Sequence, residues 1–293
     1  MLDLTVTPPQ AEPQSPSLFP YNKWQAELPE LAPQYRNNQP YPHIHLTDFL
    51  DVETAEAAAL EFPDHAGDAW IQYKHFNENK LGMTKRELFP PHIGRLVDEL
   101  NSPPFLSWLS ELTGVPNLLA DTTLEGGGMH QSVRGGFLNM HADFTMHHYH
   151  RHWRRRLNLI LYLNPGWQAE WGGALELWDE HMTHCVARVD PLLNHAVIFS
   201  TDEKSFHGFP EKLTCPGGVA RRSLALYYYT EEAVTRHAAK STNYQPRPGD
   251  TKSKSAIIWL DKEAVDLYSR VKSRLGLSDD LASRVLGFLS RKK

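Results

Sequence analysis

The sequence is poor in cysteine and has no long hydrophobic run, and both absences narrow the class of protein. Its 293 residues include two cysteines, Cys185 and Cys215, too few for a structural zinc site or a disulfide-rich domain. We expect two free thiols in a reducing cytoplasm, with a single disulfide as the alternative. No run of about 18 apolar residues could span a bilayer, and the first residues lack the pattern of a secretion signal.

Surplus positive charge and a serine-nucleophile motif are also missing. The formal net charge is -5, so we expect no nucleic-acid partner, which usually needs a basic stripe. The lack of a long apolar run likewise predicts no membrane partner. The absence of a G-x-S-x-G motif excludes the common serine hydrolases. Gly126-Gly127-Gly128 is not followed by the Gly-Lys-Ser/Thr of a phosphate loop, so we expect a sharp bend there.

The first forty residues form a proline-rich segment. They hold eight of the 21 prolines, and proline breaks helices and strands alike. We therefore predict an extended arm over residues 1–40. Phe19, Tyr21 and Trp24 suggest that part of the arm packs onto the domain or a partner, and a loosely ordered tail is the alternative.

Helical patterns precede and follow the central part of the chain. Within residues 41–118 we expect helices near 51–61 and 93–113, the second interrupted at Pro103-Pro104, which buttress a sheet. Within residues 236–293 the sequence predicts a polar linker. This linker is expected at residues 245–255, and two helices are expected after it, at residues 261–275 and 278–290.

The most informative motif is His141-Ala142-Asp143, which His207 follows much later in the chain. Side chains at i and i+2 of a strand point to the same side, so His141 and Asp143 can reach one ion. Two histidines and one carboxylate hold Fe(II) on one face and leave the other face open for substrate and dioxygen. The pattern therefore predicts an iron oxygenase.

Two strand-like segments carry groups suited to a carboxylate. Arg221 and Ser223 share one face of the run 220–230, and an arginine fork binds a carboxylate in bidentate fashion. Asn158 and Tyr162 share one face of the run 157–164, from which Tyr162 can donate a second hydrogen bond.

With these motifs the chain resembles the Fe(II)- and 2-oxoglutarate-dependent dioxygenases, in particular their prolyl-4-hydroxylase-like branch. The resemblance covers about residues 42–232. It rests on the H-x-D motif and on four further segments, Arg156–Pro165, Trp171–Trp178, Ser205–Gly208 and the Arg221 strand.

This resemblance implies a mainly β fold with flanking helices, around a double-stranded β-helix or jelly-roll, cupin-like core at residues 119–235. The core and the helical buttress of residues 41–118 together make a dioxygenase domain at 41–235. The short strands separated by Gly, Pro, Asn and Asp agree with this fold.

The resemblance also implies the roles of the site residues. His141, Asp143 and His207 bind iron and are catalytic, and Arg221 pairs with the distal carboxylate of 2-oxoglutarate. The adjacent Arg222 is the alternative anchor. Cosubstrate binding is assisted by Tyr162, Ser223 and Asn158. Dioxygen is the second cosubstrate, ascorbate is a candidate reductant, and the retained Asp143 favours hydroxylation over halogenation.

The loop after the H-x-D motif is rich in histidine and arginine. We interpret it as a polar loop, with a second metal site or an anion-binding lip as alternatives. His147 and Arg151 are candidate substrate contacts, as is Trp178, although a tryptophan is more often core or rim packing.

The implied reaction hydroxylates an unactivated C–H bond and releases succinate and carbon dioxide. The substrate is amino-acid-like, peptidyl with proline as one candidate, or a small natural product. The same chemistry can also desaturate, cyclise or epimerise, and a non-catalytic jelly-roll scaffold that holds a metal is the alternative from another class.

Overall fold

Alternation of apolar and polar side chains over two long strands organises the fold. In β7 (Trp153–Tyr162) Leu157, Leu159 and Leu161 pack into the main hydrophobic core, while Asn158 and Ile160 line a cavity on the opposite face. In β12 (Arg221–Glu231) the side chains alternate in the same way. This period-two pattern gives the sheet one face for a core and one for a site.

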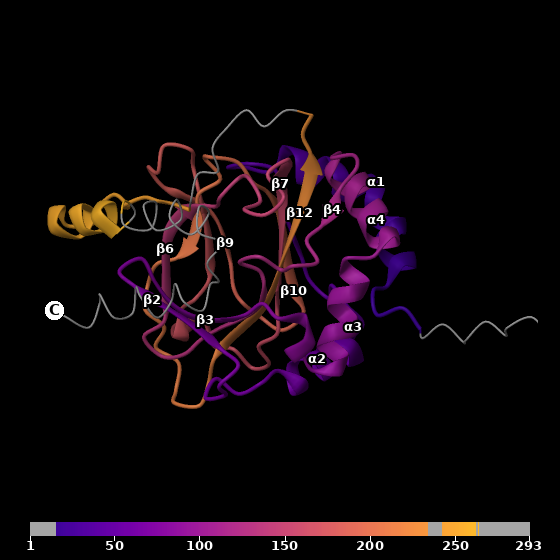
Figure 1. Cartoon of the computed structure of the whole chain (residues 1–293), viewed down its shortest axis with the longest axis horizontal. Coiled ribbons are helices and arrows are strands. Elements are labelled where there is room, and N and C mark those ends of the chain that lie inside the picture. Colours follow the sequence, from indigo (N-terminus) through magenta and orange to yellow (C-terminus); the bar gives the residue numbers. More distant parts are fainter. Residues whose placement is uncertain (1–15, 234–241, 262, 264–293) are drawn as a thin grey trace, which may run out of the picture.

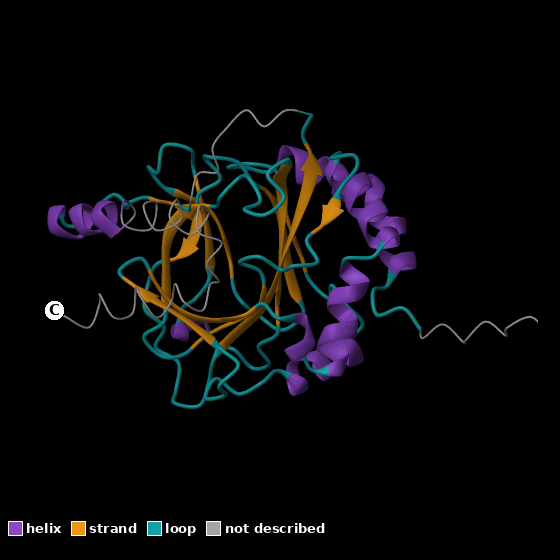
Figure 2. Ribbon diagram, in the orientation of Figure 1, coloured by secondary structure: helices purple, strands orange, loops and turns teal. Residues whose placement is uncertain are grey.

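The computed structural model describes residues 16–233, 242–261 and 263. Within them, thirteen strands form one antiparallel sheet that curves back on itself (Figure 2), in the order β1-β10-β7-β12-β5-β3-β6-β11-β8-β9, with β2 paired to β3, β4 to β12 and β13 to β6. The other strands are β1 (His43–Leu46), β2 (Ile71–His75), β3 (Glu78–Met83), β4 (Leu119–Ala120), β5 (Gly128–Ser132), β6 (Phe137–Ala142), β8 (Leu175–Trp178), β9 (Cys185–Val189), β10 (His195–Ser200), β11 (His207–Phe209) and β13 (Asn243–Tyr244). The expected mainly β, double-stranded β-helix fold is confirmed.

Four helices cover the outer side of the β7 and β12 strands (Figure 1). They are α1 (Tyr21–Asn37), α2 (Val52–Glu61), α3 (Pro91–Leu100) and α4 (Pro103–Thr113), and short 3-10 turns lie at Arg86–Leu88 and Ala169–Trp171. Apolar residues of all four helices share one core cluster with Leu157, Leu159 and Leu161. The expected helical buttress is therefore present.

The prediction of an extended N-terminal arm is wrong for residues 21–37, which form the helix α1. Pro29 and Pro33 lie inside this helix with exposed side chains, while Trp24, Leu28 and Tyr35 are buried. The Trp24 indole also donates a hydrogen bond of 2.8 Å to the carbonyl of Phe49. Burial of one apolar face outweighs the backbone hydrogen bonds that the two prolines remove.

The expected interruption of the helical pattern is confirmed as a break at Asn101-Ser102, and Pro103-Pro104 begins the second helix. The two prolines occupy the first positions of α4, where a missing N–H costs nothing. At the other end, residues 252–261 are helical, so the predicted linker 245–255 ends earlier than expected. The helices predicted at 261–275 and 278–290 lie outside the described residues, apart from 261 and 263.

Three smaller expectations concern the bend, the thiols and the membrane. Gly126 and Gly128 adopt positive φ angles of 70° and 84°, and a Cβ on Gly128 would overlap the Met83 carbonyl oxygen, so the sharp bend is confirmed. Cys185 and Cys215 are free, as expected. Among the described helices, none has the length and apolar character needed to cross a membrane.

Candidate active site

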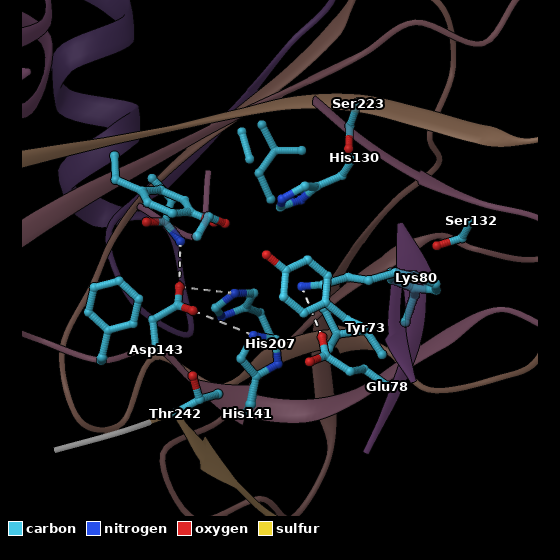
Figure 3. A pocket seen from close by; sticks show the side chains of 18 of the residues that line it. Tyr73, Glu78, Lys80, His130, Ser132, His141, Asp143, His207, Ser223 and Thr242 are labelled. Atoms are coloured by element: carbon cyan, nitrogen blue, oxygen red, sulfur yellow. Dashed lines mark hydrogen bonds and ion pairs between the residues drawn. The ribbon is translucent and has the colours of Figure 1, made fainter. Parts of the chain in front are cut away.

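Three potential metal ligands converge where β6 and β11 pair. His207 lies directly opposite His141 in this antiparallel register, and Asp143 follows the end of β6. The Nε2 atoms of His141 and His207 lie 3.6 and 3.4 Å from the Asp143 carboxylate oxygens, and one ligand atom from each residue lies within 4.8 Å of the others. Figure 3 shows the three side chains pointing toward one another.

The hydrogen bonds of the two imidazoles leave the correct nitrogen for a metal. His141 Nδ1 lies 3.0 Å from the carbonyl of Asn139, and His207 Nδ1 lies 2.9 Å from the carbonyl of Ser205. A carbonyl only accepts, so in the neutral form of each ring Nδ1 carries the proton and Nε2 presents a lone pair. Burial and the neighbouring His141 lower the pKa of His207 to about 4, which keeps it neutral. This donor set fits Fe(II).

A buried arginine and an amide hold the Asp143 carboxylate. Arg155 Nη2 and Asn158 Nδ2 donate hydrogen bonds of 2.9 and 2.7 Å to the same oxygen of Asp143, Oδ2. Burial by itself would raise the pKa of Asp143, but the Arg155 guanidinium holds it well below its usual range. The carboxylate is therefore ionised and oriented for a metal.

The cavity beside these three residues has a volume of about 260 Å³, and Arg221 lies in its wall. The Arg221 guanidinium donates hydrogen bonds to the Gly173 carbonyl at 2.7 Å and to the Tyr162 hydroxyl at 3.2 Å. It also lies 4.1 Å from the centre of the Phe209 ring. Burial lowers its pKa, and within the described residues no carboxylate pairs with it. A ligand carboxylate would fit this position.

The structure brings most of the expected cosubstrate residues to this cavity. Arg221 and Ser223 line it from the same face of β12, while the side chain of Arg222 turns away and donates to the carbonyl of Ala59 at 3.4 Å. Tyr162 does not line the cavity, and its hydroxyl accepts a hydrogen bond from Arg221. Asn158 also lines the cavity, but its amide binds Asp143, so its contact is with the metal side of the site.

The three candidate substrate contacts do not line the cavity. His147 is fully buried between Asp121 and Glu125, at 3.4 and 3.5 Å from their carboxylates. Arg151 lies exposed in a turn, and Trp178 is buried with its indole bound to Glu176 at 2.9 Å. The carboxylates of Asp121 and Glu125 therefore hold the histidine-rich loop in place through His147. The one group of potential metal ligands found among the described residues is that of His141, Asp143 and His207.

Sequence reasoning missed Arg155, which strict strand alternation places on the face opposite to Asn158. In the pairing with β12, Leu157 lies opposite Tyr228 and Arg155 opposite Tyr229, so one residue of β7 is bulged out between them. A β-bulge reverses the facing of the residues beyond it. A buried carboxylate such as Asp143 needs a cationic partner, and this need was the signal that could have identified an arginine near Asn158.

The hairpin of β2 and β3 was also missed as part of the cavity wall. Tyr73, His75, Glu78 and Lys80 line the cavity together with Tyr244 of β13, and Figure 3 shows Tyr73, Glu78 and Lys80 beside the metal-ligand residues. No motif marks these residues, because the hairpin reaches the site only through pairing of β3 with β5 and β6.

Comparisons with known proteins agree with this geometry. Residues 127–229 match the family model of the 2OG-Fe(II) oxygenase superfamily. The mouse protein Prolyl 3-hydroxylase OGFOD1 is 28% identical over 190 residues, which are 64% of this chain and 31% of the relative. The chain thus spans about a third of that relative's length.

A solved structure shares the fold. The prolyl hydroxylase of Trichoplax adhaerens, in complex with a hypoxia inducible factor oxygen degradation domain peptide, superposes with a TM-score of 0.51 at 16% identity. The match covers 71% of this chain and 91% of that one. At this identity the similarity establishes the architecture.

Proposed function

We propose, on the premise that residues 127–229 belong to the 2OG-Fe(II) oxygenase superfamily, that this chain is a 2-oxoglutarate-dependent non-haem iron dioxygenase. It hydroxylates an unactivated C–H bond and releases succinate and carbon dioxide. The observation that carries the proposal is one cavity lined by His141, Asp143 and His207 and also by a buried Arg221 without a described carboxylate partner.

In this proposal the residues divide into two groups with separate tasks. His141, Asp143 and His207 would hold the iron, and Arg221 with Tyr162 and Ser223 would hold the distal carboxylate of 2-oxoglutarate. When bound, iron and 2-oxoglutarate supply the activation of dioxygen. The protein supplies orientation and a dry site.

Contacts around the two groups serve orientation. Arg155 and Asn158 keep the Asp143 carboxylate ionised and in one orientation. The backbone carbonyls of Asn139 and Ser205 fix the two imidazole rings. The side chains of Ile160, Leu175 and Phe209 add an apolar part to the cavity wall.

For the substrate we propose a prolyl residue in a peptide or protein. The mouse relative bears the name of a prolyl 3-hydroxylase, and the Trichoplax enzyme is bound to a peptide fragment. These proteins support the class of substrate, and a free amino acid or a small natural product is the alternative. The two free thiols support a reducing compartment such as the cytoplasm.

The test is succinate release from protein loaded anaerobically with Fe(II), then given 2-oxoglutarate and air. We expect turnover in the wild type that disappears in His141→Ala, and stimulation by a member of a panel of proline peptides and amino acids. Analysis of the product then distinguishes hydroxylation from desaturation, cyclisation or epimerisation. Absence of turnover would instead support a non-catalytic jelly-roll scaffold.

A further inference from the structure

A chain of four alternating charges runs from the cavity wall to the C-terminal helix. The Lys80 ammonium lies 3.0 Å from the Glu78 carboxylate, and the other Glu78 oxygen lies 2.8 Å from His75 Nε2. The other nitrogen of His75, Nδ1, lies 2.7 Å from the carboxylate of Asp261. The side chains of these four residues are 10 to 19% exposed, so solvent screens them little.

Of these four charged side chains, the three that face the cavity carry a net positive charge. Lys80, Glu78 and His75 line the cavity, whereas Asp261 lies behind them. Burial by itself would lower the pKa of His75, but Asp261 and Glu78 raise it to about 10. Glu78 raises the pKa of Lys80 in the same way, against burial. At neutral pH two cations and one anion therefore face the cavity.

The remaining carboxylate of the described cavity wall does not cancel this charge. Apart from Glu78 and the metal ligand Asp143, the lining residue with a carboxylate is Glu125. Its oxygen Oε1 lies 2.8 Å from His148 Nδ1, and Oε2 accepts a hydrogen bond from the backbone N–H of His148. Glu125 is therefore engaged by the loop that follows Asp143.

Asp261 is fixed in place by the turn of the β2–β3 hairpin. The Asn77 side chain is fully buried and donates a hydrogen bond of 2.6 Å to the Asp261 carboxylate and another of 3.4 Å to the carbonyl of Ile258. Ile258 is 1% exposed, and the Tyr244 ring packs edge-on against His75. The C-terminal helix thus holds the hairpin from outside the cavity.

We propose that Lys80 recognises an anionic group of the substrate, a carboxylate close to the reacting residue, and that His75 and Asp261 are positioning residues for it. This proposal rests on the proposed function for the identity of the reacting residue. It goes further because it names the charge of the substrate and a residue outside the matched family segment. Substrates that carry a cation at the same position are rejected by repulsion.

The experiment measures binding without turnover. Three fluorescein-labelled proline peptides differ in one residue beside the proline, which is glutamate, glutamine or lysine. Their Kd values are measured by fluorescence anisotropy under anaerobic conditions, with Mn(II) and 2-oxoglutarate present. We expect the glutamate peptide to bind the wild type about tenfold more tightly than the lysine peptide, as one charged hydrogen bond provides.

Four variants separate recognition from structural damage. Lys80→Gln should bring the ratio of the two Kd values close to one while the glutamine peptide still binds. Asp261→Asn should lower the ratio and the pKa of His75 measured by NMR, and Asp261→Glu should restore part of both. Asp250→Asn is the matched control, because Asp250 pairs with Lys254 and Arg247 near the same helix, away from the cavity; its ratio should equal that of the wild type.

Equal Kd values for the three peptides in the wild type, or binding of none, would overturn the proposal. So would an Asp261→Asn variant that keeps the wild-type ratio. These outcomes are independent of succinate release, so failure of the recognition proposal is distinguishable from failure of the proposed dioxygenase activity.

Discussion

Arg221 is a buried cation, and no carboxylate among the described residues pairs with it. Such a charge is costly unless a ligand neutralises it. We predict that Arg221→Ala raises the KM for 2-oxoglutarate about a hundredfold, because a lost charge pair costs about 2–5 kcal/mol, and that iron binding persists. Succinate formation at varied 2-oxoglutarate concentration measures this. Arg222→Ala is the control and should retain the wild-type KM, since Arg222 points toward Ala59. An unchanged KM in Arg221→Ala would show that the anchor lies elsewhere.

Arg155 contacts the proposed metal site through Asp143. Its guanidinium is 1% exposed and binds both Asp143 and Asn158. We predict that Arg155→Met weakens metal affinity about 10- to 100-fold, the usual effect of losing an outer contact of a metal ligand. Equilibrium titration with Co(II), followed by its absorption spectrum, gives the affinity. Arg154→Met removes an exposed arginine from the neighbouring position and should leave the titration curve as in the wild type.

The helix α1 depends on tertiary packing. Trp24 is 2% exposed and packs against Phe49 and Trp108. We predict that Trp24→Ala lowers the free energy of unfolding by about 3–5 kcal/mol, as other large aromatic truncations do. Urea unfolding followed by circular dichroism measures the loss. Gln25→Ala, one residue along and exposed, should change stability by less than about 0.5 kcal/mol. A loss in Trp24→Ala no larger than in this control would mean that α1 contributes little to the core.

In the strands, the alternation of side chains is a local feature, whereas the position of a bulge is not. Alternation correctly placed Arg221 and Ser223 on one inward face. Leu224 and Leu226 of the same strand lie in the core. It failed at Arg155, because the bulge between β7 and β12 depends on the register with Tyr228 and Tyr229. Strand pairing is a long-range property, so no pattern within β7 announces it.

The row of charges from Lys80 to Asp261 joins segments that are far apart in the sequence. The stability of the whole molecule therefore depends on pH. Asp261 and Glu78 raise the pKa of His75 to about 10, from an ordinary value of 6.5, against the opposing effect of burial. A raised pKa in the folded state stabilises the fold fully below about pH 6.5, and this contribution is lost as the pH rises through about 10. The groups that face His75 are Asp261, Glu78 and the Tyr244 ring.

We predict that the Tm of the wild type falls between about pH 6.5 and pH 10 more steeply than that of His75→Gln, which lacks the titrating group. Differential scanning calorimetry at closely spaced pH values measures both curves. Their difference isolates His75 from the lysines and tyrosines that titrate in the same range. Parallel curves would contradict a charged His75 in the fold.

The sequence by itself determined the candidate ligand set and the β class of this protein. The i and i+2 spacing of His141 and Asp143 and the alternation around Tyr162 and Arg221 are local features, because a strand repeats every two residues. Tertiary structure alone decided that α1 is a helix, that Arg155 faces Asp143 and that Asp261 reaches His75. Each of these depends on burial or on a partner distant in the chain, and the energy of such a contact appears only when the chain is folded.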